Sequence, residues 1–155
     1  PTSHGTLQAQ IKTVSINGSQ GNVTVTTGDQ LEIKVVAESH VELDKLCVGI
    51  IIRDQFGQDI WGTNSHLQGE SLSISAGDRI TTAFKTQINV GAGKYTVGAA
   101  IHAIPSEPQH YLNWIDNALN LNVLSQVPAD FEGLVKLPAK VVIEKSQNIT
   151  TLQQS

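Results

Sequence analysis

Methionine is missing from this sequence of 155 residues, and so is any pair of cysteines. Because the chain begins at Pro1 without a methionine, we expect it to be an excised or processed piece of a longer protein. The single Cys47 excludes an intramolecular disulfide, and its position in the apolar run LCVGIII predicts a buried, unreactive thiol. A chain of this length is expected to fold as one domain, spanning residues 1–155.

Long apolar runs and clusters of basic residues are missing as well. No run reaches the roughly 18 residues of a membrane helix, and the N-terminal stretch PTSHGTLQAQ lacks the charged and apolar regions of a signal peptide. Ten Lys and Arg residues, scattered singly, stand against fourteen Asp and Glu, for a formal net charge of -4. The sequence therefore argues against membrane insertion and against nucleic acid as a partner.

The motifs of common enzyme and metal sites are also absent. The five histidines occur singly, without HxH, HExxH or CxxC spacing, and there is no GxSxG elbow. Asp54 with Asp59, or Asp116 with a distant glutamate, are the carboxylate pairs to consider for glycoside hydrolysis, but nothing in the sequence places two acids across a cleft. We expect a non-catalytic protein with no metal and no cofactor.

Period-two alternation of apolar and polar residues is what the sequence has instead. It is clear in residues 7–11 and 31–37, and it predicts strands also at 46–53, 59–64, 79–88, 94–102 and 114–123. Turn sequences rich in Gly, Asn and Asp, such as NGSQGN and DQFGQ, separate these segments. Short strands at this spacing indicate an all-β, immunoglobulin-like antiparallel sandwich, with at most one helical turn at ELDKL.

The immunoglobulin-like order places residues 46–53, 59–64, 94–102 and 114–123 in one sheet. Alternation then predicts which side chains point into the core: Val48, Ile50, Ile52, Tyr95, Val97, Ala99, Ile101, Ile115, Leu119, Leu121 and Val123. The outward set is predicted to be Gly49, Ile51, Arg53, Trp61, Thr63, Ser65, Thr96, Gly98, Ala100, His102, Trp114, Asp116, Ala118, Asn120 and Asn122.

The outward set has small residues in its middle and aromatic, amide and charged residues around them, which is the composition of a groove. A polysaccharide suits such a groove, because a sugar stacks its C–H face on an indole and bonds its hydroxyls to polar side chains. The stretch QDIWGTNSH contributes one of the two tryptophans, Trp61. The alternative is that a loop, the C-terminal segment or a second subunit covers the small residues, and that Trp61 and Trp114 only pack.

Four blocks of sequence carry a resemblance: IIRDQFGQDIWGTNS, GAGKYTVGAAI, YLNWIDNALNLNV and FEGLVKLP. In this order they resemble the carbohydrate-binding C-terminal domain of Wzt-type proteins, the ATPase subunits of ABC transporters that export O-antigen polysaccharides. The resemblance covers residues 5–143. It implies an immunoglobulin-like domain on the cytoplasmic face of the inner membrane that binds the undecaprenyl-linked glycan and meets the transmembrane permease through the full-length protein.

The resemblance also bears on ATP hydrolysis, because this chain has no GxxxxGK[ST] loop. ATP hydrolysis would then belong to an N-terminal nucleotide-binding domain. The other class of function left open is a protein-interaction sandwich of the adhesin or adaptor kind, without glycan binding.

Seven residues are predicted to bind carbohydrate: Arg53, Trp61, Thr63, His102, Trp114, Asn120 and Asn122. The blocks WIDNAL and GTN resemble family-wide motifs, although the glycans differ between members, so Trp114 and Thr63 have an alternative role in holding the strands together. Residues outside those blocks, namely Arg53, His102, Asn120 and Asn122, are the candidates for selectivity.

The C-terminal extension, residues 127–155, predicts a homodimer. Pro128 and Pro138 break regular pairing, and KVVIEK then offers a short apolar strand at residues 141–143. Such a strand can add to the sheet edge of its own subunit or of a neighbour. The resemblance favours the neighbour, because ABC ATPases act in pairs.

Overall fold

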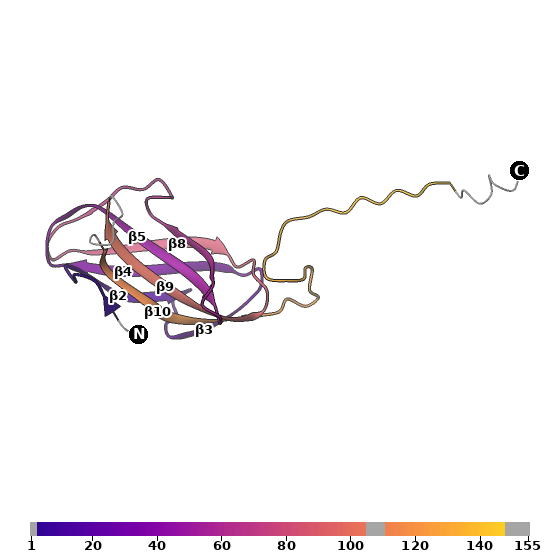
Figure 1. Cartoon of the computed structure of the whole chain (residues 1–155), viewed down its shortest axis with the longest axis horizontal. Helices are drawn as coiled ribbons and strands as arrows, with labels where there is room; N and C mark the ends of the chain where they lie inside the picture. Colours follow the sequence, from indigo (N-terminus) through magenta and orange to yellow (C-terminus); the bar gives the residue numbers. More distant parts are fainter. Residues whose placement is uncertain (1–2, 105–110, 148–155) are drawn as a thin grey trace, which may run out of the picture.

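The computed structural model describes residues 3–104 and 111–147, and these form two β-sheets packed face to face (Figure 1). Within these residues the regular elements are strands alone, which confirms the all-β sandwich. The strands are β1 (Ser3–His4), β2 (Ala9–Ile16), β3 (Asn22–Thr26), β4 (Gln30–Ser39), β5 (Leu43–Asp54), β6 (Asp59–Asn64), β7 (Leu72–Ile74), β8 (Arg79–Gln87), β9 (Gly93–Ala103) and β10 (Tyr111–Leu124). No helix in the described part of the chain is long and apolar enough to span a bilayer.

The larger sheet follows the order β1-β10-β9-β5-β6, with β3 also paired to β10 and β7 to β5. The smaller sheet follows the order β2-β4-β8. The four strands predicted to share a sheet are β5, β6, β9 and β10, and they do so. All pairs are antiparallel except β3 with β10, which are parallel.

The core lies between the two sheets, and the predicted alternation fills it. Strands β5 and β9 place Val48, Ile52, Val97 and Ile101 at exposures of 2% or less. Leu121 on β10 is fully buried. Cys47 is buried and free, as its apolar surroundings predicted.

The sequence Asn17-Gly18 carries the chain from the small sheet to the large one. Both residues have positive φ, which a two-residue type I′ turn requires, and Ile16 and Ser19 exchange backbone hydrogen bonds across them. The Asn17 side chain is bound to the backbone of Gln30 and Glu32 on β4. The turn is therefore anchored to its own sheet while the chain leaves toward β3.

One expectation about elements is wrong, and several short strands were not predicted. The stretch ELDKL forms no helical turn, because residues 43–46 belong to β5, with a register irregularity against β7 and a positive φ at Lys45. Strands β1, β3 and β7 were not predicted, since none exceeds five residues. Residues 141–143 pair with no strand of their own subunit and lie on an extended segment that runs away from the sandwich (Figure 1).

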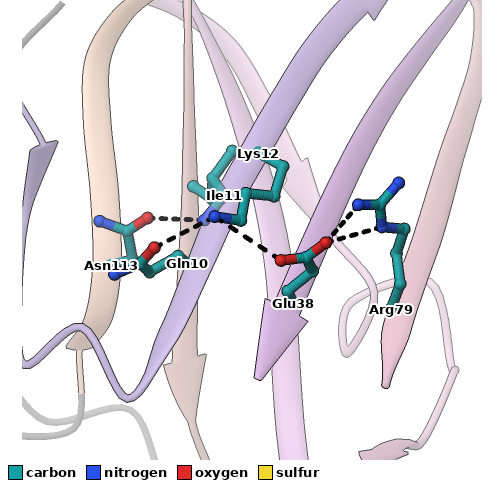
Figure 2. A network of polar contacts seen from close by, with 6 residues as sticks. All are labelled: Gln10, Ile11, Lys12, Glu38, Arg79 and Asn113. Atoms are coloured by element: carbon teal, nitrogen blue, oxygen red, sulfur yellow. Dashed lines mark hydrogen bonds and ion pairs between the residues drawn. The ribbon is translucent and has the colours of Figure 1, made fainter. Parts of the chain in front are cut away.

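The outer face of the small sheet is held by charged pairs across its strands (Figure 2). Glu38 on β4 accepts hydrogen bonds from Arg79 on β8, and Lys12 on β2 lies 3.6 Å from its other carboxylate oxygen. The hydrogen bond from Arg79 lowers the pKa of Glu38, and the charge of Lys12 adds to the effect. These groups are exposed, so their role is to order the face rather than to hold the fold.

Asn113 joins the two sheets at one end of the sandwich. Its Oδ1 accepts a hydrogen bond of 2.7 Å from the backbone N–H of Ile11 on β2 (Figure 2), and its Nδ2 donates to the backbone carbonyl of His4 and to the Ser3 hydroxyl. The side chain is almost fully buried. One amide therefore ties β10 to β2 and to β1.

Candidate functional site

A groove of about 680 Å³ lies on the outward face of the large sheet, over β5, β6, β9 and β10. Its shape follows from one row of paired residues that crosses the sheet. Trp114 opposes Ala100, Ala100 opposes Gly49, and Gly49 opposes Asn64. Small residues in the middle of the row and larger ones at both ends produce the hollow.

Two glycines, Gly98 and Gly62, form part of the groove floor, where no larger side chain fits. A Cβ at Gly98 would lie 2.8 Å from the backbone oxygen of Asp116 and 3.0 Å from the Ile51 side chain. A Cβ at Gly62 would lie 2.7 Å from the Ile51 side chain and 2.9 Å from the Ile50 carbonyl. Neither position has room for a larger residue, so the close approach of β5, β6, β9 and β10 fixes the floor of the groove.

Aromatic side chains line one end of the groove. The rings of His4 and Trp114 stack with centroids 5.1 Å apart and an interplanar angle of 25°. Tyr111 meets Trp114 edge-on at 5.7 Å and lies 5.2 Å from His102. These two ring contacts hold the Trp114 indole in place, which suits a platform for a flat ligand.

His102 is the buried polar residue of this end. It is only 8% exposed, and its Nδ1 has no hydrogen-bond partner among the described residues. Burial lowers the pKa of His102 below 6.5, and the charge of His66 lowers it further. The imidazole is therefore neutral near pH 7 and presents one donor and one acceptor nitrogen.

The depressed pKa of His102 predicts a pH-dependent stability. Between its folded-state pKa and 6.5 the unfolded chain binds more protons, so stability is present above about 6.5 and falls as the pH drops through the folded-state pKa. The wild-type protein is expected to lose more stability between about pH 7.5 and pH 5 than His102→Asn, measured by thermal unfolding. The exposed His40→Asn is the matched control. Equal losses in wild type and His102→Asn would contradict the assignment.

Arg53 and Asp116 line the groove away from His102, and Asp59 contacts Arg53 from the hairpin. The Nε of Arg53 donates a 2.8 Å hydrogen bond to Asp59 across the β5–β6 hairpin, and its Nη1 lies 3.9 Å from Asp116 on β10. The hairpin itself is closed by Asp54, whose Oδ1 accepts the backbone N–H groups of Phe56 and Gln58. The guanidinium is held in place by carboxylates on both sides.

The turn after β6 forms one wall. The Oδ1 of Asn64 accepts the N–H of Leu67, and backbone bonds from Gln68 and Glu70 to residues 64 and 65 complete the turn. Leu67 lines the groove while remaining 71% exposed. Leu67 is therefore an apolar side chain at the rim of the groove that no described neighbour buries.

The predicted site residues fall into three places. Arg53, His102 and Trp114 line the groove. Asn120 and Asn122 line a smaller hollow of about 320 Å³ farther along the same face, where Asn120 donates a hydrogen bond to Asn22. Trp61 lines neither of these hollows, but a third one of about 570 Å³ between β6 and β8, at the open side of the sandwich.

The outward orientation predicted for β6 is wrong. Trp61 pairs with Ile52, and Thr63 pairs with Ile50; directly paired residues share a face, so both side chains point to the core side. Ser65 is buried there too and accepts the Val48 N–H. A register shift between Ile52 and Arg53 at the hairpin displaces β6 by one residue, which reverses its faces.

Thr63 nevertheless lies beside the groove, since it lines both the groove and the third hollow. Its hydroxyl accepts a hydrogen bond from Gln68, which lines the third hollow. Gly62 and Asn64 are the residues of β6 that face the groove instead.

One outward prediction on β10 is also wrong. Ala118 is partly buried and packs against the core, because the register of β10 against β9 shifts between Ile115 and Leu119. Ile115, predicted to be inward, packs against the core but also lines the groove. Beyond the shift, Leu119, Leu121 and Val123 are buried as predicted.

Tyr111 and Leu67 are groove residues that sequence reasoning missed. Tyr111 begins β10 three residues before the predicted strand, and the pairing of Tyr111 with His102 was not visible without the register. Leu67 lies in a turn, outside any alternating pattern. No group of three or more His, Cys, Asp or Glu side chains in residues 3–104 and 111–147 is placed to hold a metal ion.

A β-sandwich with one broad groove on the outward face of its larger sheet defines a binding domain. The family model of the Wzt C-terminal domain matches residues 1–137, so the chain belongs to the Wzt C-terminal domain family. This domain is the carbohydrate-binding, non-catalytic module of O-antigen ABC transporter ATPases. No curated protein sequence matches the chain.

Solved structures agree on the fold. A crystal structure of the C-terminal domain of Wzt has a TM-score of 0.78 and 24% sequence identity, covering 92% of this chain and 88% of that chain. The alkylpurine DNA glycosylase AlkC of Pseudomonas fluorescens, bound to DNA containing an abasic site analog, has a TM-score of 0.50 and 13% identity over 75% of this chain and 30% of that one. At these identities the likeness concerns the fold alone.

Proposed function

We propose that the groove binds the O-antigen polysaccharide and so confers substrate specificity on the exporter, without catalysing a reaction. The observation that carries this proposal is the meeting, in one groove, of a stacked indole at Trp114, a floor of small residues and the buried imidazole of His102. A sugar ring would lie on the indole, and its hydroxyls would bond to His102 and Arg53.

Asn120 and Asn122 extend the same surface. Thr96 opposes both Arg53 and Asn120, so the end of the groove and the second hollow share one row of the sheet. From His102 to Lys94 the face runs along eight residues of β9, or roughly 27 Å at about 3.4 Å per residue. A chain of several sugars fits along such a length, with the amides bonding hydroxyls beyond the groove.

Single substitutions in the groove are expected to weaken glycan binding. Trp114→Ala and Arg53→Ala should each reduce the binding free energy by roughly 1–2 kcal/mol, because each removes one stacked or charge-assisted contact. Isothermal titration with purified O-polysaccharides measures this. Asn120→Ala should weaken the binding of longer oligosaccharides only, because Asn120 lies beyond the groove.

Trp61→Ala is the matched control, since its indole lies on the opposite face of the sheet. If Trp61→Ala weakens binding as much as Trp114→Ala, or if the groove variants bind normally, the groove is not the site. Absence of binding across an array of O-polysaccharides would favour the protein-interaction module instead.

Membership of the family supports a cellular context for the proposed function. The glycan is carried on undecaprenyl at the cytoplasmic face of the inner membrane, and a nucleotide-binding domain of the full-length protein couples the module to the transmembrane permease. In this context the domain binds the polysaccharide that is to be exported, while ATP hydrolysis takes place elsewhere in the protein.

A homodimer that exchanges residues 141–143 is part of the same proposal. Val141, Val142 and Ile143 are about 80% exposed. Residues 133–136 are fixed to the sandwich by backbone bonds with Asn89 and Gly91, so the apolar segment starts from an anchored point. In the part of the chain that the structure describes, strand β8 pairs on one side only, with β4, and its other edge is open.

Light scattering at micromolar concentration is expected to give the mass of a dimer for the intact chain and of a monomer for a version ending at Leu137. This truncation keeps the anchoring bonds of residues 133–136. A monomeric intact chain would contradict the dimer, and a dimer that survives truncation would contradict the exchange.

A further inference from the structure

The charge of the groove is the starting point for a more specific inference, which rests on the proposed function. Among the described residues that line the groove, Arg53 is the only Lys or Arg. Its guanidinium lies between Asp59 and Asp116, within 2.8 Å and 3.9 Å of their carboxylate oxygens. Two carboxylates against one guanidinium leave this end of the groove with an excess of negative charge.

The aromatic end adds no Lys or Arg from the described residues, although His4, stacked on Trp114, lies 4.0 Å from Asp116. His102 is buried at this end, and its surroundings disfavour the imidazolium form near pH 7. Its Nδ1, unpaired among the described residues, is suited to a hydroxyl group, which can donate or accept. A phosphate or a uronate would find no unpaired Lys or Arg among the described residues that line the groove.

Part of the groove lining is apolar. Ile51 lines it from β5, and Leu67 lines it from the turn after β6. Leu67 is 71% exposed, and covering it would remove apolar surface from water. A hexose offers only its ring C–H groups to such a surface, whereas a methyl substituent offers a compact apolar group.

We propose that the groove selects uncharged glycans, and that it holds a methyl-bearing sugar against the apolar surface formed by Ile51 and Leu67. The methyl group belongs to a 6-deoxyhexose or to an N-acetylated hexosamine. An anionic sugar is disfavoured because its charge would approach Asp59 and Asp116, whereas the uncharged sugar bonds His102 through hydroxyls.

The proposal is tested by isothermal titration of the whole chain with four oligosaccharides of equal length. Each consists of one kind of sugar: rhamnose, N-acetylglucosamine, mannose or galacturonate. Rhamnose or N-acetylglucosamine is expected to bind tightest, and which of the two does so identifies the source of the methyl group. Galacturonate should bind about tenfold more weakly than mannose, as expected for one added repulsive contact near the surface.

Two variants assign these preferences to the residues. Leu67→Ala should abolish the advantage of the methyl-bearing sugars over mannose. The double variant Asp59→Asn and Asp116→Asn should raise the affinity for the galacturonate oligosaccharide severalfold. Its affinity for the mannose oligosaccharide should stay unchanged. Asp130→Asn, a carboxylate paired with Lys136 outside the groove, is the matched control and should change neither preference.

The outcomes separate the inference from the proposed function. Tightest binding of galacturonate by the wild type, or preferences that survive both groove variants, would overturn the selection of uncharged, methyl-bearing glycans while leaving a glycan-binding groove. Failure of all four oligosaccharides and of purified O-polysaccharides to bind would overturn the proposed function itself, and the selectivity with it.

Discussion

Leu121→Ala is expected to lower the free energy of unfolding by about 2–5 kcal/mol, because it leaves a cavity between the two sheets. Leu121 is fully buried on β10, opposite Tyr95 on β9 and Val23 on β3. Three strands of the large sheet therefore meet at this side chain, and the surrounding residues can collapse only partly into the space. Urea unfolding followed by tryptophan fluorescence measures the change in midpoint.

Trp114→Ala is the informative comparison on the same strand. Its indole is only partly buried, and it faces the groove rather than the core. This variant should lose less stability than Leu121→Ala and more glycan affinity. If Trp114→Ala unfolds as readily as Leu121→Ala, the indole is a core residue and the groove loses its platform.

Asn113→Ala is expected to be the other strongly destabilising change. It removes the acceptor of the buried Ile11 N–H and the donor to the His4 carbonyl, and each buried group left unpaired costs about 1–3 kcal/mol. Asn113→Leu, which keeps most of the volume, should be destabilised too, because the hydrogen bonds and not the packing are lost. Hydrogen exchange should quicken at Ile11 in both variants.

Asn22→Ala serves as the control, since Asn22 accepts an exposed hydrogen bond of 2.9 Å from Asn120 and lies away from the sheet junction. Its stability should stay close to that of the wild type. A stability of Asn113→Leu that matches Asn22→Ala would mean that the amide at position 113 does not hold the sheets together.

The sequence predicts the core of this domain better than its edges. On β5 and β9 strict alternation holds along the strand, so Val48, Val97 and Ile101 were placed in the core by the period of two alone. The predicted faces of β6 were reversed, because a single register shift opposite Arg53 moves every later side chain of β6 to the other face of the sheet. No local pattern reports such an irregularity.

The same reasoning applies to the candidate site. Arg53 and His102 were found because β5 and β9 pair without a register shift, and Trp114 because it precedes the shift after Ile115 on β10. The structural role of Asn113 was missed because its partner Ile11 lies 102 positions earlier in the chain. Local sequence carries no trace of a hydrogen bond that only the packing of two sheets creates.

The irregularity on β10 has a consequence for how such domains diversify. Residues 116–118 stand opposite Gly98 alone, since Ile115 pairs with Ala99 and Leu119 with Val97. The two surplus residues are an even number, so Leu119 and the residues after it return to the core side. A lineage can therefore lengthen or shorten this stretch in steps of two and reshape the rim around its cargo, while any odd step would expose the core of β10 to water.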